Sequence, residues 1–215
     1  EAYCAPAFYL TAPLDDTNAN TIYINKKKTP GGLDLYTTLA HEGYPGHLYQ
    51  TVYSQSSDLC DLRKVMNFGS YSEGWGTYVE NYSYSLDNGL EEGLAELLRC
   101  DSSINLAICA LVDINVNYYG WSREQVKEYL ESFYSESAEE MTDFLYNIVI
   151  DEPANYVQYY EGYLELISMR DEALDEGISL KEYHTFILDF GPAQFSVIRP
   201  YFEEWLKQQT SEAAA

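Results

Sequence analysis

The sequence predicts a mainly α-helical protein with a small β element near its N-terminus. Two short runs rich in β-branched and aromatic residues, 7–10 and 21–25, flank a polar turn region and predict strands. After Gly32 the apolar residues recur with helical spacing almost to the C-terminus. Apolar residues make up 46% of the 215 residues, which is enough for the core of one globular domain.

Helix signals then divide the rest of the chain. The first helix is expected from about residue 33 towards residue 53. Gly120 ends a long apolar helix, and Ser122 with Gln125 forms a capping box that begins the next one. The other expected helices cover residues 69–84, 90–119, 122–134, 138–149, 154–176, 180–190 and 193–207. The tail from residue 211 is expected to fray.

The domain organisation follows from this pattern. We expect one domain over residues 1–215, with a β and loop region at 1–32 and a helical region at 33–210. No signal peptide opens the chain, and its abrupt start at Glu1 indicates the C-terminal part of a longer protein. No apolar stretch reaches the length of a membrane span.

Charge and cysteine content exclude several classes of protein. The chain has 12 basic and 35 acidic side chains, a net charge of −23, so nucleic acid and anionic membranes are not expected partners. Cys4, Cys60, Cys100 and Cys109 lack the C-x-x-C spacing of a structural zinc site. Buried free thiols are the first interpretation for Cys100 and Cys109, which fall in one apolar helical run, and one disulfide stays open.

The segment His41-Glu42-Gly43-Tyr44-Pro45-Gly46-His47 carries the chemistry of a metal hydrolase, because a glutamate beside a histidine ligand can act as general base. Two histidines six apart on an unbroken helix would be about 120° and 9 Å apart, too far for one zinc ion. Since the proline removes a backbone donor and the glycine relaxes the backbone, a bend can bring both rings together. The alternative is two surface histidines in a loop.

A third ligand is needed, because catalytic zinc usually takes three protein ligands and water. Glu73 is the best candidate, on a helix that can pack beside the first. Glu80 lies on nearly the same face and suits a second-shell hydrogen bond to a ligating histidine. Gly74 and Gly76 are costly inside a helix and make sense where a backbone or a metal centre approaches closely. A solvated acidic face is the alternative for both glutamates.

At this point the sequence resembles a known family. The His41-Glu42-x-x-Pro45-Gly46-His47 motif, followed by Glu73-Gly74-Trp75 with Tyr78 and Glu80, is similar to the bacterial family catalogued as domain-of-unknown-function family 885. Further matches lie at residues 6–25, at Asp113 with Gly120-Trp121-Ser122, at Pro153-Ala154 with Tyr159 and Gly162, and at Tyr183-His184.

The resemblance implies a multi-helix, metallopeptidase-like (gluzincin-like) fold that binds Zn²⁺ through His41, His47 and Glu73, with Glu42 as base. It also implies a helical N-terminal half that would be absent from this chain and would be a partner of it. The sequence departs from the family pattern at three positions: Leu48 and Asn117 stand where many members have histidine, and Ala154 replaces a glycine.

Further candidates surround this set. Tyr159 or His184 could donate a hydrogen bond to an oxyanion, an effect of about 3 kcal/mol. For both the alternative is a structural side chain. Asp113 is expected to cap or orient a neighbour, in a second-shell position. Arg123 and Arg199 are the basic groups to test against a substrate carboxylate.

We therefore expect a zinc-dependent metallopeptidase that acts on peptides, in an extracellular or cell-envelope-associated bacterial protein. The second hypothesis is a non-catalytic, metal-containing surface or binding module of a cell-envelope protein. Glycoside hydrolysis by a carboxylate pair ranks last, because no feature selects the pair.

Overall fold

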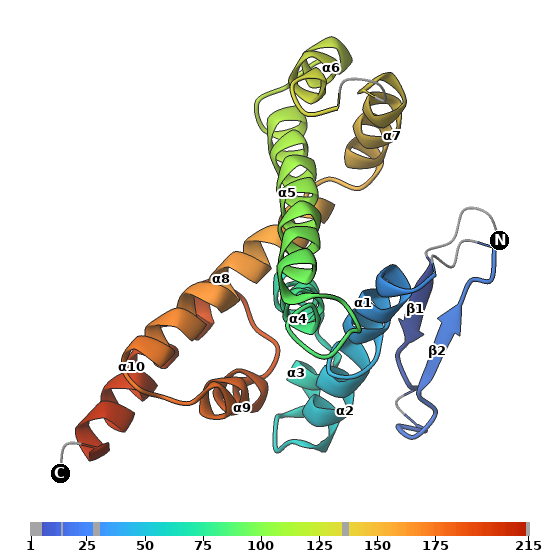
Figure 1. The fold of residues 1–215 in the computed structure, drawn as a ribbon. Helices are drawn as coiled ribbons and strands as arrows, with labels where there is room; N and C mark the ends of the chain where they lie inside the picture. The colour runs from blue at the N-terminus through green and yellow to red at the C-terminus, as the bar shows by residue number, and fades with distance from the viewer. Residues whose placement is uncertain (1–5, 14, 28–30, 135–137, 214–215) are drawn as a thin grey trace.

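The computed structural model describes residues 6–13, 15–27, 31–134 and 138–213 (Figure 1). Within them the chain forms one small sheet followed by helices. The strands are β1 (Ala7–Leu10) and β2 (Thr21–Ile24), and the helices are α1 (Leu33–Glu42), α2 (His47–Ser56), α3 (Asp61–Val65), α4 (Gly69–Ser83), α5 (Glu92–Asn117), α6 (Arg123–Glu131), α7 (Ala138–Asp151), α8 (Asn155–Asp175), α9 (Leu180–Phe190) and α10 (Phe195–Ala213). The mainly α fold with a small β element is therefore confirmed.

The sheet lies against α1. Its strands are antiparallel, with Tyr9 opposite Ile22. The backbone N–H of Asn25 donates to the carbonyl of Pro6. Because hydrogen-bonded and non-hydrogen-bonded pairs alternate along antiparallel strands, Tyr9 falls in a non-hydrogen-bonded pair, and its backbone N–H and C=O point away from β2. Tyr9 thus presents its N–H and C=O on the free edge of β1, on the side of the α1 helix.

Helix α4 is the centre of the main core. Its aromatic side chains Tyr71, Trp75 and Tyr78 are almost fully buried and pack against α8, α9 and α10. The partners that fill this core include Leu166, Met169, Tyr183, Ile187, Ile198 and Phe202. On the other side α4 packs against α1 and, through its N-terminal half, α2. This position lets one helix contribute to both the core and the site.

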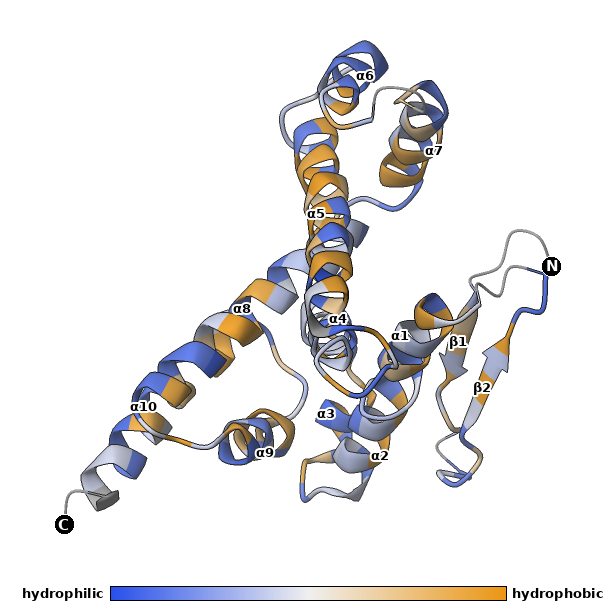
Figure 2. Ribbon diagram, viewed as in Figure 1, coloured by the Kyte–Doolittle hydropathy of each residue, from blue (hydrophilic) through white to orange (hydrophobic). Residues whose placement is uncertain are grey.

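A second apolar cluster lies along the long helix α5, where α6 and α7 pack at its far end (Figure 1). It is built from Ile108, Val112, Val126, Leu130, Leu145 and Val149. Elsewhere α5 leaves Leu97, Ile104 and Leu111 about half exposed at seven-residue spacing, which places them on one face. Hydrophobic colour recurs along much of α5 in Figure 2. The α5–α7 region is therefore a satellite of the main core.

The structure refines several expected boundaries. The expected helix over 33–53 is two helices, because the chain breaks between Glu42 and His47. The short α3 was not predicted. The last helix continues to Ala213, so the fraying expected from residue 211 does not begin there. None of the described helices is both long and apolar enough to cross a membrane.

The cysteine expectations are partly met. Cys60, Cys100 and Cys109 are free thiols, and Cys4 lies outside the described residues. Burial raises the pKa of the Cys109 thiol to about 11. Cys60, in contrast, is exposed.

Candidate metal centre

The bend between α1 and α2 brings His41 and His47 together. Helix α1 ends with a hydrogen bond from the backbone N–H of Gly43 to the carbonyl of Leu39, and α2 begins at His47. A side chain at Gly46 would place its Cβ 1.7 Å from the His41 carbonyl oxygen, so only glycine fits the bend. The Nε2 atoms of the two histidines are 3.1 Å apart, as the proline-glycine argument predicted.

Glu73 of α4 completes a triangle with them. Its Oε2 lies 3.5 Å from His41 Nε2 and 3.3 Å from His47 Nε2. Ligand atoms about 2.0–2.1 Å from one zinc in tetrahedral geometry are about 3.3–3.4 Å from each other. This Oε2 is buried and lacks a well-aligned hydrogen bond. Distances, donor chemistry and the orphaned oxygen therefore all fit a divalent ion held by these three residues.

Two hydrogen bonds orient the side chains around the triangle. His41 Nδ1 lies 2.9 Å from Glu80 Oε2, which leaves Nε2 free to face the centre. The backbone N–H of Tyr9 donates to Glu42 Oε2 at 2.7 Å, so β1 holds the carboxylate of Glu42 in place. Ligand atoms of His41, Glu42 and His47 also lie within 4.8 Å of one another. Glu42 is thus within reach of the centre, as its expected role requires.

The electrostatics favour positive charge at the centre. Burial lowers the pKa of His41, but the carboxylates of Glu73 and Glu80 outweigh it and raise that pKa to about 10. Burial raises the pKa of Glu73, whereas the nearby imidazoles of His41 and His47 lower it, and the net result lies well below the usual range. Either a proton shared among these residues or a bound metal ion would balance the negative charge of the same carboxylates.

Two glycines of α4 let the His41 ring and helix α8 approach this helix closely. A Cβ on Gly76 would lie 2.5 Å from His41 Nε2, so the imidazole occupies the space of a missing side chain. A Cβ on Gly74 would lie 2.5 Å from the backbone of Gly162 in α8. These contacts account for both glycines that the sequence singled out on α4.

Tyr159 reaches the centre from α8. Its ring stacks on His41, with 6.0 Å between centroids. Burial raises the pKa of the Tyr159 hydroxyl above its usual range, and the nearby carboxylate of Glu73 raises it further. The phenol therefore stays protonated and can donate a hydrogen bond beside the triangle.

His184 and Asp113 lie elsewhere. Nε2 of His184 is 2.7 Å from the hydroxyl of Tyr78, on the face of α4 that is turned away from Glu73. Asp113 is buried and accepts the N–H groups of Ala154 and Tyr156, which caps the start of α8. Asp113 therefore orients the helix that carries Tyr159 and contacts none of the three proposed ligands.

The two arginines considered for a substrate carboxylate are engaged on the surface. Arg123 pairs with Glu139 and Asp143, and Arg199 pairs with Glu172. None of these contacts involves the centre. The positive φ of 65° at Ala154 fits the glycine that the family pattern has there, since an alanine is strained in this region.

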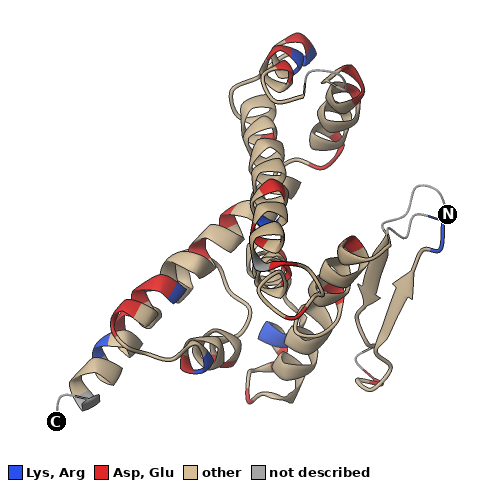
Figure 3. Ribbon diagram, viewed as in Figure 1, with Lys and Arg blue, Asp and Glu red and all other residues tan. Residues whose placement is uncertain are grey.

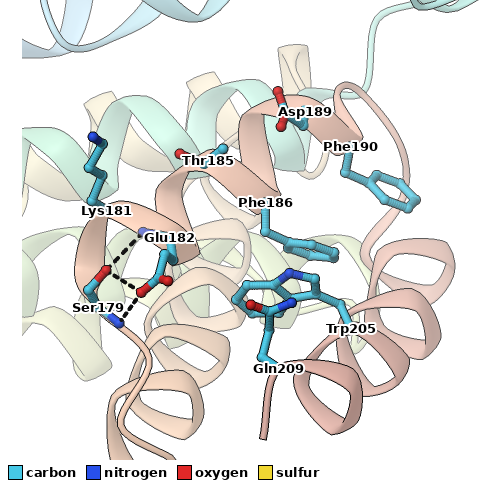
Figure 4. A pocket seen from close by; sticks show the side chains of 9 residues that line it. All are labelled: Ser179, Lys181, Glu182, Thr185, Phe186, Asp189, Phe190, Trp205 and Gln209. Carbon is cyan, nitrogen blue, oxygen red and sulfur yellow. Dashed lines mark hydrogen bonds between the residues drawn. The ribbon is translucent and has the colours of Figure 1, made fainter. Parts of the chain in front are cut away.

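A cleft of about 670 Å³ opens beside the centre and is lined by Tyr9, His47 and Glu73. A second hollow of about 740 Å³ lies between α9 and α10, where Phe186 stacks on Trp205 (Figure 4). Ser179 and Glu182 at its rim form the capping box of α9, so their polar atoms are already used. Since none of the predicted site residues lines this hollow, the cleft beside the centre is the candidate site.

Comparison with known families decides the relationship. The family model described as "Bacterial protein of unknown function (DUF885)" matches residues 1–200. The chain belongs to this family. No protein in a search of the curated proteins matches.

Two solved structures share the fold of this DUF885 chain. A "putative lipoprotein" from Colwellia psychrerythraea matches with a TM-score of 0.81 at 23% identity, covering 96% of this chain and 36% of that one. A "putative lipoprotein of unknown function" from Shewanella oneidensis matches with a TM-score of 0.70 at 22% identity, covering 90% and 38%. The chain thus spans little more than a third of the length of either protein.

Proposed function

We propose that this DUF885 chain carries the catalytic centre of a zinc-dependent peptidase. The observation that carries the proposal is the triangle of His41 Nε2, His47 Nε2 and Glu73 Oε2, whose edges of 3.1 to 3.5 Å suit one ion. Two imidazoles and one carboxylate are a ligand set typical of catalytic zinc. When bound, Zn²⁺ would lower the pKa of a water molecule to about 7 and polarise a carbonyl.

The other roles in the proposed reaction belong to Glu42, Tyr159 and Glu80. Glu42, held by the Tyr9 N–H at 2.7 Å, takes a proton from the attacking water and delivers it to the leaving amine. Tyr159, kept protonated by its surroundings, donates a hydrogen bond to the oxygen that becomes negative. Glu80 fixes the His41 ring by accepting from Nδ1.

The cleft supports a peptide as substrate. Its wall includes Tyr9 on the free edge of β1, and the outward backbone carbonyl of Tyr9 can accept from an extended chain. A peptide offers the amide groups that such an edge recognises.

A cell-envelope location is part of the same proposal. The two solved structures compared above are described as putative lipoproteins. That description supports an envelope-associated peptidase that acts on peptides outside the cytoplasm. Fractionation of the native protein would check it.

The Glu42→Gln variant tests the chemistry. It should keep metal within about twofold of the parent and lose about 10²–10⁴-fold in turnover of a peptide library, because only the base is removed. Glu128→Gln, which changes an exposed glutamate on α6, is the matched control and should behave like the parent. Turnover by Glu42→Gln at the parent rate would show that Glu42 is not the base.

Metal removal separates the peptidase from a binding module. A chelator should abolish cleavage, and added Zn²⁺ should restore it. Bound metal at one ion per chain without chelator-sensitive cleavage would instead favour the non-catalytic module. Metal content by mass spectrometry and peptide products by chromatography provide the two readouts.

A further inference from the structure

The cleft beside the metal centre contains a single basic side chain among the described residues that line it. Lys64 of α3 shares this cleft with His47 and Glu73. The rest of the lining is neutral, and its polar members are Tyr9, Thr11, Gln50, Thr51, Ser54, Gln55, Asn67 and Ser72. Charge in this cleft therefore comes from Lys64, Glu73 and any ion that the centre holds.

Lys64 has donor capacity left for a ligand. Its Nζ donates to the backbone carbonyl of Gln55 at 3.1 Å, which uses one of three N–H groups. Gln55 also lines the cleft, and its side-chain Oε1 is buried and has no hydrogen-bond partner. A cation with free donors beside an unpaired amide oxygen can receive both a carboxylate and a peptide N–H.

The surroundings make this cation distinctive. The chain has a net charge of −23, with 35 Asp and Glu against 12 Lys and Arg, whereas α3 carries basic residues (Figure 3). Arg63, the neighbour on α3, is engaged with the carbonyls of Phe190 and Pro192. Lys64 is thus the basic group of α3 that lines the cleft, where its charge attracts an anion.

The distance from the centre can be estimated along α2. His47 and Gln55 are eight residues apart on this helix, which corresponds to about 12 Å along its axis. An extended peptide covers about 3.3–3.6 Å per residue, so this span equals three to four residues.

We propose that Lys64 binds a carboxylate of the substrate three to four residues from the cleaved bond. The inference rests on the proposed peptidase function. The substrate class is then a peptide with an acidic side chain, or a C-terminal carboxylate, at that distance. Gln55 Oε1 accepts a backbone N–H of the same peptide.

Binding and cleavage test the inference separately. Zn²⁺-loaded Glu42→Gln protein is titrated with labelled peptide pairs that differ only by Glu or Gln at one position, or by a free or amidated C-terminus. Glu should bind about 10-fold more tightly than Gln at the matching position. Adding Lys64→Gln should abolish this preference, Lys64→Arg should keep it, and Lys207→Gln on the exposed surface of α10 should leave it unchanged.

Mass spectrometry of products from the otherwise unmodified chain gives the position of the cleaved bond. A carboxylate preference three to four residues from that bond supports the inference, and the two peptide sets show whether it comes from a side chain or a terminus. A preference that survives Lys64→Gln, or none in the parent, overturns it. A Lys64-dependent preference without cleavage supports the carboxylate subsite while it refutes the peptidase function.

Discussion

The two faces of α4 hold two histidines in opposite electrostatic states. On one face, His41 lies beside Glu73 and Glu80, and its pKa is raised to about 10 although burial acts to lower it. On the other, His184 lies against Trp75 and Tyr78, and burial with the nearby Arg170 lowers its pKa to about 4. Both rings are largely removed from water, and the charges beside them distinguish them: two carboxylates beside His41 and a guanidinium near His184.

The surroundings of a buried histidine thus decide whether it is a candidate ligand. A ring among aromatic groups is neutral and has its Nε2 bonded to a phenol, so it has no reason to bind a cation. The His41 ring has its Nδ1 bonded to a carboxylate and its Nε2 facing a second imidazole. In these surroundings a positive charge, from a proton or a metal ion, is favoured. Substitutions on the Glu73 face of α4 should therefore change metal affinity, whereas substitutions on the His184 face should change the free energy of unfolding.

The largest effect is expected for Gly76→Ala. The new Cβ would lie 2.5 Å from His41 Nε2, so the imidazole must move out of the triangle. We expect zinc affinity to fall more than the 10–100-fold typical of outer-shell changes, measured by competition with a chromophoric chelator. Gly93→Ala on α5, which has open space at its Cβ, is the control and should leave affinity unchanged. Unchanged affinity in Gly76→Ala would place the metal elsewhere.

A smaller effect is expected for Glu80→Ala. This change removes the acceptor of His41 Nδ1 and leaves the three proposed ligands in place. Zinc affinity should fall about 10–100-fold, with a milder loss for Glu80→Gln, because an amide oxygen can still accept the bond. Calorimetric titration with Zn²⁺ gives both values. Equal affinity in Glu80→Ala and the parent would rule out a supporting role for this carboxylate.

The smallest effect is expected on the aromatic face. The pKa of His184 is lowered from 6.5 to about 4 on folding, so the unfolded chain binds a proton that the folded chain does not. The free energy of unfolding of the metal-free protein should therefore decrease as the pH falls from about 6.5 to 4, and His184→Gln should flatten this part of the profile. Urea titrations at several pH values measure it. A profile identical to that of the parent, or a loss of zinc affinity at neutral pH, would contradict this assignment.

Much of the fold was predictable because its signals are local. The capping box at Ser122 and Gln125 and the boundaries of α9 agree with the structure. The short α3 was missed, since five residues carry too little periodicity to be recognised. The break after Glu42 was foreseen from the proline and glycine, although its extent was not.

The candidate site was likewise predictable only in part. The triangle followed from the motif and from the family resemblance, and Tyr159 from the resemblance alone. His184 could not be assigned from sequence, because its position on the far face of α4 depends on how α9 packs. The backbone N–H of Tyr9, which orients Glu42, was missed since a backbone donor on a strand edge leaves no residue signature. Tertiary packing decides such contacts.

Where Gly74 meets Gly162, two backbones touch without side chains between them. Side chains that change rotamer can absorb a displacement between helices, and here none is present to do so. Rotation of α8 about this point would swing the Tyr159 phenol relative to Glu73. The crossing therefore fixes α8 against α4 three residues from Tyr159, and the hydrogen bonds of Asp113 hold the N-terminal end of the same helix.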